Sequence, residues 1–237
     1  MRLARVDTPE GPVTGEYRDG AVHANDGVYE AEREDLLAPC EPSALYCVGR
    51  NYAATIDSMG YDAPDEPDFF IKPPASVVGP GDEVPYPTFS EEVTYAGELA
   101  AVVDERCTNV APDEVPDVLR GYTIVNDMDA LDQQGRTARK AWDASGPLGP
   151  WIETDVDPVD EPMSMSTDVA GERRQEATTE LMLFGAHEIV SYLSERFTFR
   201  PDDVIAFGSP DNPGLVEPGD EVAITYEGVG TLRNTVV

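Results

Sequence analysis

The sequence carries far more acidic than basic side chains, and this imbalance limits the conditions under which the chain can become compact. It has 47 Asp and Glu residues against 16 Lys and Arg residues, a formal net charge of −31 at pH 7. Such a charge repels itself and opposes folding in dilute buffer. At about 1 M salt the Debye length falls to about 3 Å, so most of the repulsion is screened. The composition therefore predicts a protein adapted to concentrated salt, with an acidic protein of an ordinary low-salt cell as the alternative.

Lysine is almost absent from the chain. Arginine accounts for 14 of the 16 basic residues, and only Lys72 and Lys140 are lysines. A chain that has lost nearly all of its surface lysines is expected to keep those that have a specific task. We therefore expect both lysines to belong to a functional site.

Charge and hydropathy exclude several classes of function. The negative field disfavours nucleic acids and anionic membranes as partners. No apolar run approaches the roughly 18 residues needed to span a bilayer, and the first residues lack the apolar core of a signal peptide. The 3 cysteines form no CxxC pair and do not suit a disulfide framework. These features predict a soluble cytoplasmic protein.

Short apolar runs separated by turn residues indicate a mostly β protein. Hydrophobic residues make up 41% of the chain, enough for a core, and 20 Gly and 21 Pro are spread along it. Strand patterns stand at residues 45–48, 99–103, 122–125 and 222–226. Helical patterns stand only at residues 113–119 and 186–193. We predict an α+β, mostly β fold with few helices, in which residues 1–42 form a small N-terminal β domain and residues 43–237 the core.

Four segments depart from this pattern through clusters of charged, aromatic and glycine residues. They include Gly49-Arg50-Asn51-Tyr52, Phe69-Phe70-Ile71-Lys72-Pro73, Tyr95-Ala96-Gly97-Glu98-Leu99, Asn126-Asp127, Lys140-Ala141-Trp142-Asp143 and Phe207-Gly208-Ser209-Pro210. Taken in this order, the segments resemble the fumarylacetoacetate hydrolase family over residues 43–237. Both lysines fall inside them, in agreement with the argument from composition.

The resemblance implies a core of strands rolled into a barrel-like shape, usually as a homodimer. Members of the family act on small 2-oxo or dioxo acids by C–C bond hydrolysis, decarboxylation or isomerisation. They use a divalent cation, which binds the adjacent carboxylate and carbonyl oxygens of the substrate and stabilises the developing enolate. The resemblance thus implies a small carboxylic acid as substrate and Mg²⁺ or Mn²⁺ as cofactor.

The metal site that the resemblance implies has lost one ligand in this chain. The family's ligands are two glutamates at i and i+2 on one strand face and the Asp of an Asn-Asp motif. The matching positions are Ala96, Glu98 and Asp127. Asp129 shares a strand face with Asp127, so we take it as a hypothetical replacement ligand. Alternatively, Glu98 and Asp127 are solvated surface acids that bind no metal ion.

The remaining site positions keep cations but lose the acid–base pair. The resemblance assigns catalysis to Lys140 and Gln134, and substrate binding to Arg50, Asn51, Tyr52, Lys72, Gly208 and Ser209. Thr55 and Ser58 replace the His and Glu that commonly activate water, and Leu131 replaces an arginine.

A purely structural role is the alternative at several of these positions. Lys140 forms either a substrate contact or a structural ion pair, and Arg50 and Asn51 either bind substrate or anchor their loop. Gly208 is either an anion-binding N–H donor or a turn residue. For His187 we expect a helix-capping or surface role in the helical pattern at 186–193, and not the role of the missing catalytic base.

Two functions are therefore compatible with the sequence. The first is an enzyme that acts through a metal- and lysine-stabilised enolate. Decarboxylation and tautomerisation need enolate stabilisation more than a strong base, so they tolerate the losses better than hydrolysis does. The second is a degenerate relative that binds a small acid or a partner without turnover.

Overall fold

The computed structural model describes residues 1–60, 62–211 and 214–237, and the side chains of residues 57–59 lie outside this description. Strands predominate and the helices are few and short, which confirms the α+β, mostly β class. No helix in this described part of the chain is long and apolar enough to cross a membrane.

The elements follow one another as many short strands with a few short helices between them. The strands are β1 (Arg2–Val6), β2 (Val13–Arg18), β3 (Ala21–Ala24), β4 (Gly27–Glu30), β5 (Leu36–Leu37), β6 (Leu45–Gly49), β7 (Asp68–Lys72), β8 (Val77–Val78), β9 (Glu83–Val84), β10 (Val93–Thr94), β11 (Gly97–Val103), β12 (Leu119–Asn126), β13 (Asp129–Ala130), β14 (Gly146–Glu153), β15 (Ser164–Val169), β16 (Glu172–Thr178), β17 (Val204–Ala206), β18 (Glu221–Tyr226) and β19 (Gly230–Val236). The α-helices are α1 (Ala53–Met59), α2 (Val115–Val118), α3 (Arg136–Lys140) and α4 (Ala186–Ser194). Single 3-10 turns cover Arg33–Asp35, Pro74–Ser76, Pro112–Glu114 and Thr179–Leu181.

Two large sheets enclose the main core. The larger sheet has 12 strands in the order β4-β3-β2-β1-β14-β12-β11-β17-β6-β7, with β5 paired to β1 and β8 to β14. The second has five strands in the order β16-β15-β18-β19-β9. Leu99 and Ile124 of the larger sheet belong to the same buried cluster as Ile224 and Leu232 of the second. Burial of such apolar side chains is the main force that holds the two sheets together.

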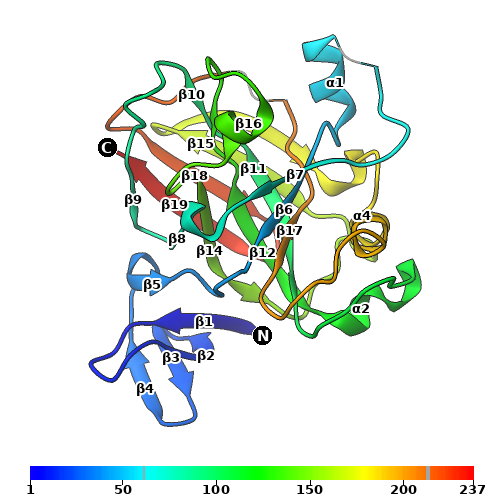
Figure 1. Cartoon of the computed structure of the whole chain (residues 1–237). Coiled ribbons are helices and arrows are strands. Elements are labelled where there is room, and N and C mark those ends of the chain that lie inside the picture. The colour runs from blue at the N-terminus through cyan, green and yellow to red at the C-terminus, as the bar shows by residue number, and fades with distance from the viewer. Residues whose placement is uncertain (61, 212–213) are drawn as a thin grey trace.

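The N-terminal strands lie at one end of the molecule, opposite α1 (Figure 1). β1 pairs with β14, with Leu3 opposite Ile152, so these strands extend the larger sheet. They also bury an apolar cluster of their own around Trp151, whose ring stacks on Tyr17 at 5.3 Å. The division into residues 1–42 and 43–237 stays a prediction, because the first part shares both a sheet and a tryptophan with the second.

The helical pattern at residues 113–119 is confirmed for residues 113–118, but as two short helical turns and not as one longer helix. The structure has a 3-10 turn there, followed by one turn of α2, and Leu119 already pairs with Val103 as the first residue of β12. Pro112 and Pro116 suit only the first positions of such short helical turns, which limits their length. The pattern at 186–193 is confirmed as α4, with Ile189, Val190 and Leu193 buried.

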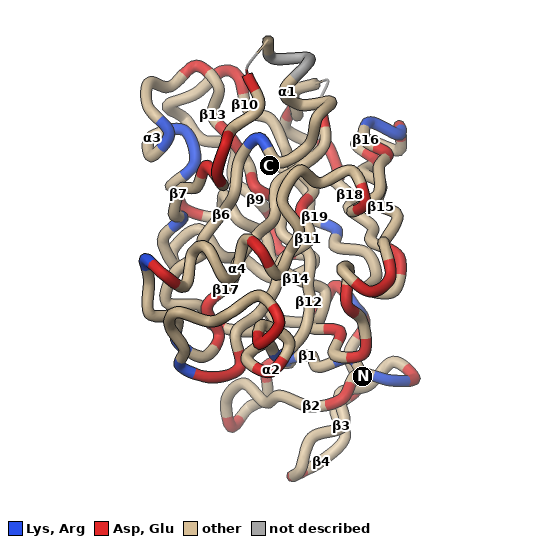
Figure 2. Tube along the Cα trace, turned by 90° about the vertical axis from the view of Figure 1, so that its right-hand side faces the viewer, with Lys and Arg blue, Asp and Glu red and all other residues tan. Residues whose placement is uncertain are grey.

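Acidic segments are spread over the turns and loops around the sheets, whereas basic segments are few and short (Figure 2). A charge of −31 distributed in this way repels itself over the whole surface. We expect the melting temperature to rise by about 10 °C or more between roughly 0.1 M and 2 M KCl, about 3 kcal/mol for a chain of this size. A thermal denaturation series in KCl measures this, and an unchanged melting temperature would contradict salt adaptation.

Candidate active site

Strand pairing brings the two predicted metal ligands together. In the β11–β12 ladder Gly97 lies opposite Asn126 and Glu98 opposite Val125, and the Asp127 N–H donates to the Ala96 carbonyl at 2.9 Å. Glu98 is the second residue of β11 and pairs with the end of β12. Asp127 follows directly after β12, so the two acids lie close together. Glu98 and Asp127, here called the acid pair, are both buried.

A cavity of about 580 Å³ opens beside the acid pair. This volume suits a small organic ligand. Its lining contains 4 of the chain's 16 cationic residues, namely Arg50, Arg136, Arg139 and Lys140. The same lining has three acids, Glu98, Asp127 and Asp129, so cations exceed acids by one in a chain of net charge −31, and this local excess favours an anionic ligand.

Asp127 is held between both lysines of the chain. The Lys72 ammonium lies 3.0 Å from Asp127 Oδ1, and the Lys140 ammonium contacts Asp127 Oδ2. Burial raises the pKa of Asp127, but the attraction of Lys140 and Lys72 outweighs this effect and holds the pKa below its ordinary value. Asp127 is therefore ionised at neutral pH.

Glu98 has the opposite electrostatic balance. Burial, reinforced by the negative charge of Asp127, raises its pKa to about 8. Lys140 and the Gly208 N–H, which donates to Glu98 Oε2 at 3.0 Å, counter only part of this rise. The acid pair thus combines one ionised carboxylate with one that resists ionisation.

Lys72 is fully buried and its ammonium is saturated by protein oxygens. Besides Asp127, it donates to the carbonyls of Met128 at 3.1 Å, Ser145 at 2.9 Å and Lys140. Burial holds the pKa of Lys72 below its ordinary value despite the attraction of Asp127. With all its donors engaged, Lys72 positions Asp127 and the chain around Ser145, and it does not line the cavity to meet a substrate.

Lys140 differs from Lys72 because it lines the cavity. Its ammonium contacts Asp127, lies 3.4 Å from Asp129 Oδ2, and stands 5.4 Å from the centre of the Phe70 ring. Burial lowers the pKa of Lys140, but the charges of Asp127 and Asp129 outweigh it and raise the pKa above its ordinary value. Lys140 is therefore a fixed positive charge at the cavity wall.

Asp129 is engaged by an arginine. Arg139 donates from Nε to Oδ1 at 2.8 Å and from Nη2 to Oδ2 at 2.6 Å, a bidentate pair. Within the described residues, no group of three His, Cys, Asp or Glu side chains is arranged to hold a metal ion. Asp129 lines the cavity beside the acid pair with its oxygens on Arg139, and its role as a replacement ligand stays a prediction.

The Asn51 side chain anchors a loop. Its Nδ2 donates to the carbonyls of Phe207 at 2.8 Å and Phe184 at 3.1 Å, and its Oδ1 accepts the Phe184 N–H at 2.9 Å. Of the two interpretations left open for Asn51, the structural one fits these contacts. Tyr52 is buried and does not line the cavity either.

Of the predicted pair Gly208 and Ser209, only Ser209 lines the cavity. Gly208 has φ +89°, and a Cβ there would lie 2.9 Å from the Asn51 Cβ, so both conformation and space require glycine. Its N–H is committed to Glu98. Ser209 lines the cavity, and its hydroxyl accepts a hydrogen bond from Gln175 Nε2 at 2.9 Å.

The predicted acid–base positions are only partly at the cavity. Gln134 is exposed and does not line it, in contrast to its predicted catalytic role. Thr55 and Leu131 do line it, and the Thr55 hydroxyl donates to the Ser209 carbonyl at 3.0 Å. The side chain of Ser58 lies outside the described residues.

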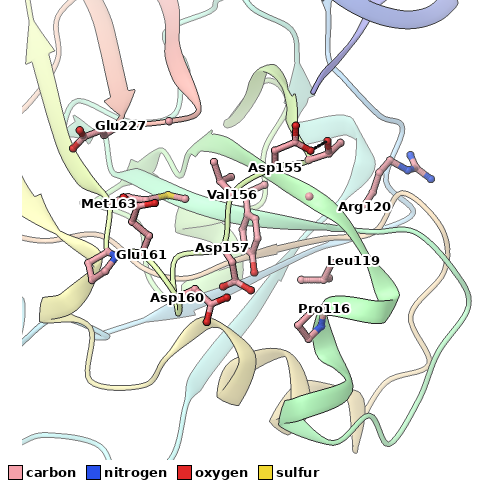
Figure 3. Close-up of a pocket in the computed structure, with 15 residues that line it drawn as sticks. Pro116, Leu119, Arg120, Asp155, Val156, Asp157, Asp160, Glu161, Met163 and Glu227 are labelled. Atoms are coloured by element: carbon pink, nitrogen blue, oxygen red, sulfur yellow. Dashed lines mark hydrogen bonds between the residues drawn. The ribbon is translucent and has the colours of Figure 1, made fainter.

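A second, larger cavity of about 840 Å³ has the opposite charge (Figure 3). The acids that line it are Asp155, Asp157, Asp160, Glu161 and Glu227. Its one arginine, Arg120, is already paired with Asp104 and Asp202. An anionic substrate is repelled there, so the charge of the walls and not the volume distinguishes the candidate active site.

The chain matches the family model described as fumarylacetoacetate (FAA) hydrolase C-terminal over residues 44–237. The chain belongs to the fumarylacetoacetate hydrolase family. The resemblance drawn from the motifs is thereby confirmed.

Three relatives illustrate what members of this family do. The structure is similar to 5-carboxymethyl-2-hydroxymuconate delta-isomerase from Mycobacterium smegmatis, with 37% identity, a TM-score of 0.89 and coverage of 100% of this chain and 98% of that one. It is similar to fumarylpyruvate hydrolase from Pseudomonas aeruginosa in complex with Mn²⁺ and pyruvate, with 30% identity, a TM-score of 0.78 and coverage of 94% and 98%. Oxaloacetate tautomerase YisK from Bacillus subtilis is 33% identical over 227 residues, 88% of this chain and 75% of that protein.

The acid pair meets the chemical needs of a hard divalent cation in this family. Both groups are buried carboxylates, and their mutual repulsion, which contributes to the raised pKa of Glu98, is relieved by a bound cation. Mg²⁺ is commonly bound by one or two carboxylates, with waters and substrate oxygens as its other ligands. Glu98 and Asp127 therefore fit such an ion without a third protein carboxylate.

The motifs of the family gave no indication of Arg136 and Arg139. The composition did contain a signal, because two of only 14 arginines precede Lys140 within four positions. Gln175 of β16 was also missed. It holds the cavity wall through Ser209 and the Pro210 carbonyl, and nothing in its local sequence points to that role.

Proposed function

We propose that this chain is an enzyme that forms the enolate of a small 2-oxo or dioxo acid. The observation that carries the proposal is the acid pair at the wall of a cavity in which the chain's scarce cations gather. Carboxylates for a divalent cation and a lysine beside them suit a substrate that gains negative charge on oxygen during the reaction.

The proposed roles follow from position. Glu98 and Asp127 hold Mg²⁺ or Mn²⁺, and the ion, when bound, polarises the adjacent carboxylate and carbonyl oxygens of the substrate. Lys140 faces the same substrate and stabilises the enolate oxygen as a fixed positive charge. Lys72 positions Asp127, and Asp129 positions Arg139.

Tautomerisation or decarboxylation suits this site better than hydrolysis. Hydrolysis needs a base to activate water, and Thr55 stands where the family commonly has histidine. His23 lies in the N-terminal hairpin and His187 pairs with Asp157 at the acidic cavity, so neither histidine of the chain reaches the site. The isomerase and tautomerase activities named for two relatives support this choice.

Exchange of hydrogen for deuterium at the carbon next to the substrate carbonyl tests the proposal, because exchange reports enolate formation whatever the later step. With Mn²⁺ and a small 2-oxo acid in deuterated molar KCl, we expect exchange well above that of the metal alone, measured by proton NMR. Lys140→Met is expected to lower the rate about 100-fold or more. Arg233→Gln, at an exposed arginine paired with Glu221, is the control and keeps the rate.

The second candidate is a relative that binds a small acid or a partner without turnover. The loss of the family's base at Thr55 favours it. Binding of a 2-oxo acid with no exchange above the metal alone would select this candidate and contradict the enzymatic proposal.

We further infer a homodimer, a cytoplasmic location and adaptation to salt, with a small carboxylic acid as the ligand. The family resemblance supports the dimer, and the charge of −31 supports the adaptation to salt. All assays are therefore designed in molar KCl.

A further inference from the structure

Gln175 of β16 is a buried amide that joins three parts of the structure. It belongs to the second sheet, and only 3% of it is exposed. Its Oε1 accepts the N–H of Gly97, the first residue of β11, at 3.2 Å. Its Nε2 donates to Ser209 Oγ at 2.9 Å and to the carbonyls of Pro210 at 3.0 Å and Asp211 at 3.2 Å. One side chain thus ties the second sheet and the start of β11 to one stretch of the cavity wall.

The absence of a side chain at Gly97 allows this contact. A Cβ at Gly97 would lie 2.6 Å from Thr167 Oγ1 and 2.9 Å from Ile224 Cγ2, closer than packed atoms come. Glycine therefore lets the second sheet approach the backbone of β11. Thr167 lies opposite Gln175 in the β15–β16 ladder, which brings Gln175 to the same point. The two sheets meet there, at the residue next to Glu98.

Residues 208–211, here called the wall segment, also hold one oxygen of Glu98. The Gly208 N–H donates to Glu98 Oε2 at 3.0 Å, and Gly208 directly precedes the residues that Gln175 binds. The wall segment reaches the cavity through Ser209 and Pro210, and Glu98 lines the same cavity. The position of the wall segment therefore fixes the donor that orients Glu98.

We propose that Gln175 is a positioning residue for the metal ligand Glu98. It holds the wall segment against β11, so that the Gly208 N–H stays on one oxygen of Glu98 and the carboxylate meets the cation in one orientation. Partners that orient a ligand in this way typically contribute about 10–100-fold to metal affinity. The inference rests on the proposed function, because it takes Glu98 to bind Mg²⁺ or Mn²⁺. It adds to that site a residue from the second sheet.

Binding of Mn²⁺ measures this role without any need for turnover. Gln175→Met keeps the length and approximate volume of the side chain but removes every hydrogen bond of the amide. We expect it to weaken Mn²⁺ binding about tenfold or more, measured on the full chain in molar KCl from the EPR signal of free Mn²⁺. Gln175→Asn keeps an amide that is one methylene too short to join β11 to the wall segment. It is expected to weaken Mn²⁺ binding as well, and it replaces Gln175→Met if that variant does not fold.

Asn234→Leu is the matched control for a loss of stability alone. Asn234 of β19 is also a buried amide, 4% exposed, and it donates to the carbonyls of Gly79 at 2.8 Å and Asp82 at 2.9 Å. It does not line the cavity. We expect this variant to lower the melting temperature as the Gln175 variants do, but to keep the dissociation constant of Mn²⁺ within about twofold of the wild type.

A double-variant cycle tests whether Gln175 acts through Glu98. In Glu98→Gln the oriented carboxylate is already lost, so adding Gln175→Met is expected to weaken Mn²⁺ binding little further. The same fold-change from Gln175→Met in both backgrounds would overturn the assignment of Gln175 to Glu98.

The outcomes distinguish this inference from the function on which it rests. If the Gln175 variants bind Mn²⁺ as tightly as the wild type, or if Asn234→Leu weakens binding equally, Gln175 does not position Glu98, while the proposed function stands. If the wild type binds no Mn²⁺, with or without oxalate, both proposals are overturned.

Discussion

Lys72→Met is expected to lower the free energy of unfolding by about 3–5 kcal/mol, because it leaves Asp127 as a buried charge with one partner fewer. Met occupies a similar volume, so the cost comes from charge and hydrogen bonding and not from an emptied core. Three backbone carbonyls, those of Met128, Lys140 and Ser145, also lose their donor. Urea denaturation in molar KCl measures the change.

Lys140→Met is the matched comparison. Its ammonium contacts the same Asp127, but the side chain is 14% exposed at the cavity wall, where water replaces part of what is lost. We expect less than half the destabilisation of Lys72→Met, together with the loss of exchange activity. Equal destabilisation by the two substitutions would contradict the assignment of one lysine to the fold and the other to the substrate.

Glu98→Gln is expected to make the metal-free protein more stable than the wild type at pH 9, with little difference at pH 5. The folded pKa of Glu98, about 8, lies above its unfolded value, so the folded state binds this proton more tightly. The stability that this proton contributes is present below the unfolded pKa and is lost as pH rises toward 8. Glutamine does not titrate, so the variant keeps its free energy of unfolding as pH rises. The wild type loses on the order of a few kcal/mol of that free energy.

The pH series needs a chelator and a matched acid variant. Asp127 has a lowered pKa, so its contribution is lost only as pH falls through that lowered value, below the window in which Glu98 titrates. Glu172→Gln removes an exposed glutamate and is expected to keep the wild-type slope. A slope in Glu98→Gln identical to that of the wild type would show that Glu98 ionises without cost in the folded protein.

Much of the site's identity was predictable because it depends on residue type and order. The scarcity of lysine pointed to Lys72 and Lys140, and the family resemblance implied that Glu98 and Asp127 belong to one site. The apolar face of residues 186–193 predicted α4 correctly. These features are local or follow from the pairing of two neighbouring strands.

The sequence did not predict how deeply each site residue is buried or whether it reaches the cavity. Nothing in the sequence shows that Lys72 is enclosed by carbonyls while Lys140 reaches the cavity. Gln134 matched a catalytic position in order along the chain, yet it stands exposed in the loop before α3.

Contacts between segments far apart in the sequence were hidden for a related reason. Asp68 and Arg136 are 68 positions apart, and their pairing depends on how β7 meets α3. Asn51 reaches Phe184 and Phe207 across more than 130 positions. The motif marks Asn51 as a site residue, but only the tertiary structure shows that its amide holds the loop.

The central claim is that the acid pair and Lys140 form a site for a divalent cation and a 2-oxo acid. Thermal denaturation with Mn²⁺, with oxalate as a mimic of the enolate, and with both together in molar KCl tests it most directly, in the wild type and in Glu98→Gln. The account predicts a larger rise in melting temperature with both ligands than the two separate rises combined, and the loss of that rise in Glu98→Gln. No rise in the wild type, or the same rise in both proteins, would contradict it.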